Sequence, residues 1–222
     1  MIWAVVPVKD FDAAKQRLRA TLAPHERRAR ARAMLVDVLA ALARVRALDE
    51  LVLVTREPDA IALARRFEAL ILSEPENRGQ TAAVERALDE AHRHGVRAVL
   101  ALPGDVPLIT PADVEAILRA GERADVVLVP SRDRRGTNAL WLRLPARLPL
   151  RFGEESFRFH RRAAEERKLR AAVLDLPRIA LDVDAPEDLG ELARRYAEGG
   201  EHLAHSHTAR LLEGLSWRVR FR

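Results

Sequence analysis

At residues 99–108 the chain reads Val99-Leu100-Ala101-Leu102-Pro103-Gly104-Asp105-Val106-Pro107-Leu108. The apolar run that opens it is typical of a buried strand, and the Pro-Gly pair predicts a turn. The turn places Asp105 at the carboxyl end of the strand, where ligands lie in open α/β sheets. Gly104 would let a ligand approach the backbone, and Asp105 has the hard oxygen atoms that Mg²⁺ prefers. The alternative is an Asx-turn aspartate that only stabilises the loop.

Short β-branched runs alternate with segments of helical period along the rest of the chain, which is typical of βα units around a largely parallel sheet. Strands are expected at 2–8, 51–55, 69–72, 97–102, 125–130, 138–144, 171–175 and 179–183, and helices at 24–46, 59–67, 80–94, 111–120, 156–168 and 186–198. We therefore expect an α/β fold in a single domain, residues 1–198. Residues 199–222 are expected to form a flexible polar tail; the alternative is that His202, His205 and His207 bind a metal.

Length and composition narrow the class of protein. The chain has 222 residues, 48% of them hydrophobic, which is enough to bury a core without disulfides or a structural metal. It has no cysteine, which excludes disulfides and thiol catalysis. No apolar run is long enough to span a bilayer, and the start, Met1-Ile2-Trp3, has no charged leader. We expect a cytoplasmic protein with no membrane partner.

The balance of charge is basic, with a net charge of +5 and a pI near 10.5. Basic and acidic residues are interleaved, however, and the six Phe, three Trp and one Tyr do not alternate with the basic residues. A nucleic-acid partner is therefore not expected, and a mild positive field suits small phosphorylated substrates equally well. A basic RNA-binding α/β module is the alternative from a different class.

Two of the three lysines, Lys9 and Lys15, follow the first apolar run, and Arg17 lies close behind. Ammonium groups just after a strand can follow a phosphate oxygen as it moves. The pair is therefore a candidate phosphate site, with ordinary surface lysines as the alternative.

A second acidic motif reads Ile179-Ala180-Leu181-Asp182-Val183-Asp184. In a strand, residues two apart face the same way, so Asp182 and Asp184 would project together. Carboxylates that close repel each other unless a cation lies between them. With Asp105 they would complete an all-oxygen Mg²⁺ site, although Asp184 could instead be the N-cap of the helix that starts at Pro186.

Two polar loops complete the candidate site. Residues 129–140 include Gly136-Thr137-Asn138, whose hydroxyl, amide and backbone N–H groups suit a carboxylate or phosphate; a plain hairpin turn is the alternative. Gly153 precedes an expected helix start at Ser156, where N–H groups favour anions. His160, one turn further on, could face the same ligand, or could simply be packed. The chain has no Gly-Lys-Ser/Thr, Gly-x-Gly-x-x-Gly or Gly-x-Ser-x-Gly motif, which argues against P-loop, dinucleotide and serine-hydrolase enzymes.

In their order and spacing these pieces resemble the 2-phospho-L-lactate guanylyltransferase family of coenzyme F(420) biosynthesis. The matching stretches are Val6-Pro7-Val8-Lys9, Ala14-Lys15-Gln16-Arg17-Leu18, 102–108, Pro130-Ser131, 136–140, Phe152-Gly153, Ser156-Phe157, His160 and 181–186. The resemblance implies a nucleotidyltransferase fold of the nucleotide-diphospho-sugar transferase type, a mostly parallel mixed sheet flanked by helices. It also implies transfer of GMP from GTP to 2-phospho-L-lactate, phosphoenolpyruvate or 3-phosphoglycerate, with release of diphosphate.

The resemblance also implies a role for each matching residue. By motif, the ligands of Mg²⁺ would be Asp105, Asp182 and Asp184, and catalysis would involve Lys9, Lys15 and Asp105. The acceptor would be bound by Thr137, Asn138, Gly153, Ser156 and His160. The nucleotide would be bound by Pro7, Lys9, Lys15, Gly79, Gln80, Thr81, Pro103 and Gly104. The family commonly has Gly-Leu-Asn where this chain has Gly79-Gln80-Thr81. A CTP-using enzyme with another phosphorylated acceptor is therefore the alternative within enzymes. A homodimer is compatible with the long helix expected at 24–46, which could instead pack on the sheet.

Overall fold

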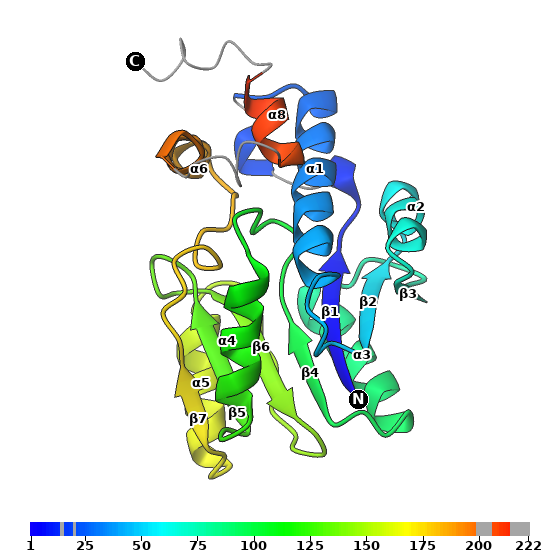
Figure 1. Cartoon of the computed structure of the whole chain (residues 1–222), viewed down its shortest axis with the longest axis vertical. Coiled ribbons are helices and arrows are strands. Elements are labelled where there is room, and N and C mark those ends of the chain that lie inside the picture. Colours follow the sequence, from blue (N-terminus) through cyan, green and yellow to red (C-terminus); the bar gives the residue numbers. More distant parts are fainter. Residues whose placement is uncertain (14–15, 20, 199–205, 214–222) are drawn as a thin grey trace.

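A mixed sheet runs through the molecule and, within the residues that the structure describes, has seven strands in the order β3-β2-β1-β4-β6-β5-β7 (Figure 1). The structure is a computed structural model and describes residues 1–13, 16–19, 21–198 and 206–213. The strands are β1 (Ile2–Val8), β2 (Glu50–Thr55), β3 (Leu70–Ser73), β4 (Ala98–Ala101), β5 (Val126–Pro130), β6 (Thr137–Arg143) and β7 (Ala171–Val173). β6 pairs antiparallel with β4 and β5, and the other pairings are parallel. The expected α/β fold with a mostly parallel mixed sheet is confirmed.

Helices connect the strands in the alternating order that the sequence predicted. They are α1 (Pro24–Leu42), α2 (Pro58–Arg66), α3 (Gln80–Arg93), α4 (Pro111–Gly121), α5 (Ser156–Glu166), α6 (Pro186–Glu198) and α8 (His207–Glu213), with short 3₁₀ turns at Phe11–Ala13 and Gln16–Leu18. α1 ends at Leu42, four residues before its expected end. In the described ranges, no helix combines the length and apolar character needed to cross a membrane.

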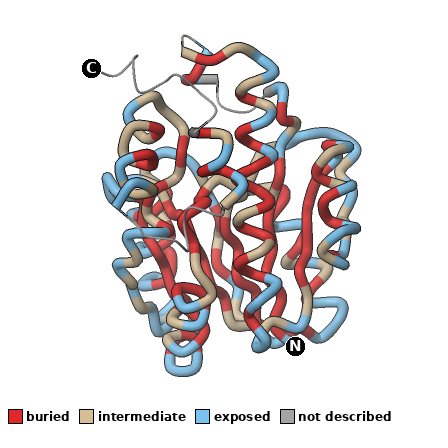
Figure 2. The backbone as a smooth tube through the Cα atoms, turned by 45° about the horizontal axis from the view of Figure 1, so that its top comes forward, coloured by how far each residue is buried: buried red, intermediate tan, exposed pale blue. Residues whose placement is uncertain are grey.

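The two faces of the sheet are covered by different helices, as the period of two along each strand requires. On β1, Ala4 and Val6 face a core shared with α1, α2 and α4, whereas Trp3 and Val5 face α3. β5 and β6 divide their side chains in the same way between that first core and α5. Figure 1 shows α4 in front of the sheet and α5 behind it, and Figure 2 shows the buried strands between them. α1 thus packs on the sheet of its own chain.

The strand expected at 179–183 is absent from the described sheet, and this expectation was wrong. The segment is extended but is held by single hydrogen bonds: Arg132 N donates to Ala180 O (2.8 Å), and Val183 N donates to Asp105 O (3.2 Å). The hydrogen bond from Arg132 lies beyond the end of β5, so it adds no further strand to the sheet. Leu181 and Val183 instead enter a separate apolar cluster with α6 and α8.

Part of the expected polar tail is a helix that packs on the domain. α8 contacts α1 and α6, and Asp37 of α1 accepts hydrogen bonds from the backbone N–H groups of His207 (2.8 Å) and Thr208 (2.9 Å). Ala209 and Leu212 are buried. Residues 207–213 therefore belong to the fold, whereas His202 and His205 lie outside the described residues.

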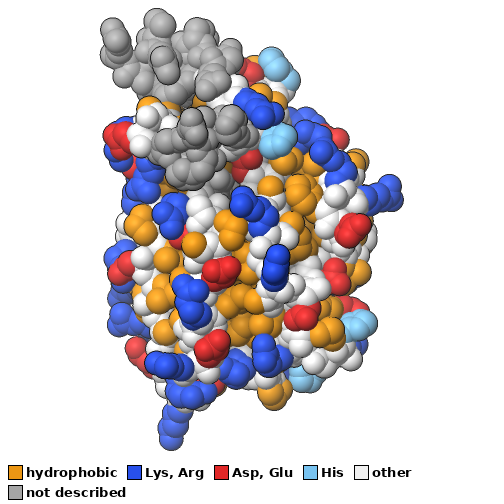
Figure 3. Space-filling model, in the orientation of Figure 1, with side chains coloured by type: hydrophobic (Ala, Val, Ile, Leu, Met, Phe, Trp, Pro, Cys, Tyr) orange, Lys and Arg blue, Asp and Glu red, His pale blue; other side chains and the backbone are white. Residues whose placement is uncertain are grey.

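Charged side chains of both signs are interspersed on the face of the molecule shown in Figure 3. Many charged side chains of the described residues form ion pairs, such as Arg194 with Glu191 (2.8 Å) and Arg162 with Glu166 (2.7 Å). Exposed pairs of this kind add little stability.

Gly121, at the end of α4, gives a test of the packing between helix and sheet. A Cβ at this position would overlap the indole ring of Trp141 on β6, so Gly121→Ala should lower the free energy of unfolding by about 1–3 kcal/mol. Gly190 on α6 is the matched control, because a Cβ there meets no atom within 4 Å. Gly190→Ala should be neutral or stabilising, by up to about 1 kcal/mol. Urea denaturation measures both, and equal effects of the two substitutions would contradict the packing.

Candidate active site

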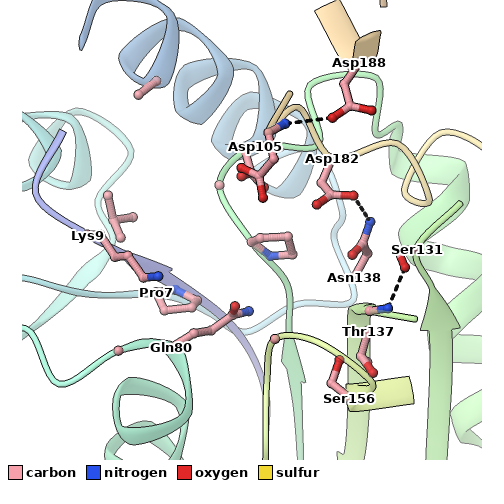
Figure 4. A pocket seen from close by; sticks show the side chains of 18 of the residues that line it. Pro7, Lys9, Gln80, Asp105, Ser131, Thr137, Asn138, Ser156, Asp182 and Asp188 are labelled. Carbon is pink, nitrogen blue, oxygen red and sulfur yellow. Dashed lines mark hydrogen bonds between the residues drawn. The ribbon is translucent and has the colours of Figure 1, made fainter. Parts of the chain in front are cut away.

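A cavity of about 620 Å³ lies at the edge of the sheet where the parallel strands end. Its walls come from the segments after β1, β3, β4 and β5, from the start of β6, and from the segment that leads into α6. In Figure 4, Pro7, Lys9 and Gln80 lie on one side, Thr137 and Ser156 lie on the other, and Asp105 and Asp182 lie side by side above them. The sequence motifs at 7–9, 103–105, 136–138, 153–156 and 182–184 thus line one cavity.

The first side of the cavity brings together the end of β1 and the start of α3. Pro7, Lys9, Gly79 and Gln80 line it, as predicted for nucleotide-binding residues. Gly79 precedes the helix with φ of +90°, a conformation that favours glycine, and the start of a helix is a natural site for anions. Lys15 lies outside the described residues, so its predicted role stays a prediction.

Thr81 and Gly104 have structural roles beside the predicted ones. Thr81 is not among the lining residues; its Oγ1 accepts a hydrogen bond from the N–H of Phe152 (3.0 Å) and so ties α3 to the opposite side of the cavity. Gly104 does line the cavity, and a Cβ there would lie 3.1 Å from Leu35 Cδ1. A larger residue here would require the Leu35 side chain of α1 to shift slightly.

The three predicted metal-ligating aspartates all line the cavity. Leu181 and Val183 are buried on the other side of the same extended segment, so Asp182 and Asp184 share a direction as predicted, although not within a strand. Burial, followed by the charges of Asp105 and Asp184, raises the pKa of Asp182 to about 6. Carboxylates that repel each other in this way are a donor set that a divalent cation would stabilise.

No group of three or more His, Cys, Asp or Glu side chains within the described ranges is already arranged as a metal-ligand cluster. The Mg²⁺ site of Asp105, Asp182 and Asp184 therefore stays a prediction. Its support is the chemistry of the donor set and the electrostatic coupling of the three groups.

Asn138 and Asp188 hold the segment that carries the acidic pair. Asn138 Nδ2 donates to Ile179 O (3.0 Å) and to Asp182 Oδ1 (3.0 Å). Asp188 accepts hydrogen bonds from the backbone N–H groups of Asp184 (3.1 Å) and Ala185 (2.9 Å) at the start of α6. The helix start is thus capped by the side chain of Asp188, and Asn138, predicted as an acceptor-binding residue, also orients Asp182.

The loop between β5 and β6 is both a hairpin and a wall of the cavity. Ser131 Oγ accepts a hydrogen bond from the N–H of Gly136 (2.7 Å) and donates to Asp133 (2.6 Å). That hydrogen bond, with a second from the N–H of Arg135, lowers the pKa of Asp133. A Cβ on Gly136 would lie 3.0 Å from Ser131 Oγ, so glycine keeps this turn closed. The two interpretations of residues 129–140 are therefore compatible.

The second side of the cavity presents hydroxyl groups from β6 and α5. Thr137 and Ser156 line it together with Gly153, whose φ is +107°. Ser156 is fully buried, and its Oγ has no hydrogen-bond partner in the described part of the chain. A buried hydroxyl without a partner is costly. This one would be satisfied by a ligand in the cavity.

His160 lies behind this wall, which differs from the direct ligand contact that we expected. It is fully buried and is not among the residues that line the cavity. Its Nδ1 lies 3.0 Å from Thr137 Oγ1, and its Nε2 accepts a hydrogen bond from the backbone N–H of Arg151 (3.1 Å). Burial, followed by the charge of Arg151, lowers the pKa of His160 to about 4.

Several lining residues were not predicted from the sequence, among them Glu74, Asn77, Asp133, Glu154 and Asp188. Asn77 could have been recognised, because an asparagine two residues before a glycine is typical of an Asx turn. In the structure its side chain accepts a hydrogen bond from the N–H of Gly79 (3.1 Å). Glu74 follows β3 and reaches the cavity only through the parallel pairing of β3 with β2. No local pattern marks it.

Comparison with solved structures defines the class of protein by its fold. A Desulfovibrio desulfuricans protein assigned to the nucleotide-diphospho-sugar transferases superposes with a TM-score of 0.81 at 19% identity, over 99% of this chain and 96% of the other. A nucleotidyl transferase from Methanothermobacter thermautotrophicus superposes with a TM-score of 0.62 at 16% identity, over 90% and 99%. The chain thus has the nucleotide-diphospho-sugar transferase fold.

Sequence comparison then gives the family. A family model described as "Guanylyl transferase CofC like" matches residues 2–215. A phosphoenolpyruvate guanylyltransferase of Rubrobacter xylanophilus is 44% identical over 90% of this chain and 95% of its own length, and one of Conexibacter woesei is 40% identical over 92% of each. A 2-phospho-L-lactate guanylyltransferase of M. thermautotrophicus is 41% identical over 85% and 82%. The chain belongs to the CofC-like guanylyl transferase family, which confirms the resemblance.

The buried His160 predicts a pH dependence of stability. Its pKa is about 4 in the folded protein and about 6.5 in the unfolded chain, so the unfolded state binds the proton first as the pH falls. This contribution is fully present above pH 6.5 and is lost as the pH falls from 6.5 toward 4, amounting to roughly 2 kcal/mol between pH 7 and pH 5. Urea denaturation of wild type and His160→Asn at both pH values measures it, and equal losses in the two proteins would contradict the prediction.

Proposed function

We propose that this protein transfers GMP from GTP to a three-carbon phospho-acid and releases diphosphate, in coenzyme F(420) biosynthesis. The observation that carries the proposal is the single cavity with an ammonium and a helix start on one side, buried hydroxyl groups on the other, and three aspartates in the same cavity. The names of its relatives, guanylyltransferases of phosphoenolpyruvate and 2-phospho-L-lactate, support the same reaction.

The two sides of the cavity suit the two substrates. The triphosphate would lie against Lys9 and the start of α3, where a cation and backbone N–H groups meet anionic oxygens. The acceptor carries one carboxylate and one phosphate, and would lie against Thr137, Ser156 and Gly153. Asp105, Asp182 and Asp184 would hold Mg²⁺, which neutralises charge on the reacting phosphates when it is bound.

In the reaction a phosphate oxygen of the acceptor attacks the α-phosphorus of GTP in line. The bond from that phosphorus to the bridging oxygen breaks, and diphosphate leaves with the electron pair. The attacking phosphate is already ionised, so a strong general base is not required. The chain's own part is to align the two substrates and to place Lys9 against the charge that develops on the triphosphate.

An assay of diphosphate release tests the reaction directly. Phosphoenolpyruvate, 2-phospho-L-lactate and 3-phosphoglycerate are each supplied with GTP, ATP, CTP or UTP, with and without Mg²⁺. We expect release with GTP, with at least one of the three acceptors, and only when a divalent cation is present. Release with CTP in preference to GTP would overturn the assignment of the nucleotide, and release without a divalent cation would overturn the metal site.

Asp182→Asn separates catalysis from folding. The substitution keeps the shape of the side chain and removes a half-buried charge that repels its neighbours, so the free energy of unfolding should be unchanged or higher. Turnover should fall by roughly 100-fold or more, because charge neutralisation at the reacting phosphate is lost. Asp89→Asn on the exposed side of α3 is the control and should leave both quantities unchanged. Near-full turnover in Asp182→Asn would rule out this carboxylate as a metal ligand.

A further inference from the structure

His160 is held in one orientation by its packing as well as by its hydrogen bonds. The ring centroid lies 5.1 Å from that of Phe152 and 5.8 Å from that of Phe159, both in edge-on geometry. The side chain is fully buried. Its contact with the cavity wall is the hydrogen bond to Thr137. Of the ring's two hydrogen bonds, the one to Thr137 is the one that reaches a residue lining the cavity.

The position of the ring proton follows from the partner of each nitrogen. A backbone N–H can only donate, so the N–H of Arg151 at 3.1 Å requires a lone pair on Nε2. A neutral imidazole then carries its proton on Nδ1. The buried ring stays neutral near pH 7, because its pKa is about 4. The opposite tautomer would place two N–H groups against each other.

The direction of the second hydrogen bond is fixed in turn. Nδ1–H donates to Thr137 Oγ1 at 3.0 Å, which occupies one lone pair of the hydroxyl oxygen. The hydrogen atom of the hydroxyl then remains available for another acceptor, and in the described residues Thr137 Oγ1 has no further hydrogen bond to the protein. Thr137 lines the cavity together with the buried hydroxyl of Ser156.

We propose that His160 is a positioning residue: by accepting from Arg151 and donating to Thr137, it makes the Thr137 hydroxyl a donor into the acceptor side of the cavity. The group recognised there is therefore a hydrogen-bond acceptor, a carboxylate or phosphate oxygen of the phospho-acid. This inference rests on the proposed function for the identity of that ligand. It gives the ring a role in affinity for the acceptor and none in proton transfer.

The tautomer can be measured without any activity. The ¹⁵N chemical shifts of the His160 ring in the unliganded protein should show a protonated Nδ1 and an unprotonated Nε2 at pH 7, with no titration above about pH 5. A protonated Nε2, or a charged ring at pH 7, would overturn the proposal. Absence of diphosphate release would refute the proposed function, while this measurement would still confirm or overturn the orientation of Thr137.

Kinetics on a matched pair of variants test the effect on the acceptor. In His160→Asn the amide nitrogen can take the place of Nδ1 and donate to Thr137, whereas in His160→Gln the amide lies nearer the position of Nε2. We expect His160→Gln to raise KM for phosphoenolpyruvate by roughly 10-fold or more, the scale of a hydrogen bond to a charged group. His160→Asn should stay close to wild type, and KM for GTP should be unchanged in both. Equal increases in both KM values would contradict a role confined to the acceptor.

Substitution of Thr137 completes the test. Thr137→Val removes the hydroxyl at nearly constant shape and should raise KM for phosphoenolpyruvate at least as much as His160→Gln, whereas Thr137→Ser should retain wild-type affinity. In the Thr137→Val background, His160→Gln should have no further effect on that KM, because the ring acts through the hydroxyl. Additive effects, or an unchanged KM in Thr137→Val, would overturn the proposal.

Discussion

The site depends on the hydrogen bonds by which Asn138, at the start of β6, holds the segment that leads into α6. One amide nitrogen donates to both Ile179 O and Asp182 Oδ1, and so fixes a loop backbone and a half-buried carboxylate to the sheet. The loop belongs to no strand pair and makes only isolated backbone hydrogen bonds, so side chains hold it: Leu181 and Val183 are buried beside α6, and Asp188 caps its end. Arg178 adds a bidentate pair with Asp113 at the start of α4 (2.7 Å for each hydrogen bond). Without these contacts the segment that carries Asp182 and Asp184 would not be placed against the strand ends.

Most of the fold could be predicted because its elements are locally consistent. The apolar runs of β1, β4 and β5 and the marked start of α4 at Thr110 and Pro111 point to the same βα pattern. The segment 179–183 was misread because an alternating pattern shows that one side is buried, not what buries it. Here the buried side meets Leu108, α6 and α8 rather than a neighbouring strand. The same cluster explains α8, whose Leu212 enters it, although a tail rich in histidine gave no sign of a docked helix.

The candidate site was predictable where a motif lies at the end of a strand, and not where a residue acts through another residue. Lys9, Asp105 and Thr137 follow or begin strands, so the sheet topology alone brings them to one edge. Glu74 reaches the cavity from the end of β3, a position that depends on the order of strands across the sheet. For His160, one turn from Ser156, the sequence left both a contact with the ligand and simple packing open. The helix carries it behind Thr137, and the period of 3.6 residues cannot decide this without the tilt of α5.

The charges around the cavity are consistent with the proposal that neutral donors bind the acceptor. Arg132 is paired with Asp188 (3.0 Å) and Arg135 with Glu155 (2.9 Å), so these cations are already engaged at the wall. A further fixed cation would bind the acceptor's anionic groups as strongly before the reaction as during it, which lowers KM without speeding the chemical step. Hydroxyl groups whose hydrogen atoms are oriented in advance bind an oxygen anion with little reorganisation. Unlike a bound cation, they add no positive charge beside the phosphate that would attack phosphorus. The hydroxyl groups of Thr137 and Ser156 on this side, opposite the ammonium of Lys9 on the other, therefore suit the proposed reaction, in which the acceptor supplies the electron pair and diphosphate leaves with one.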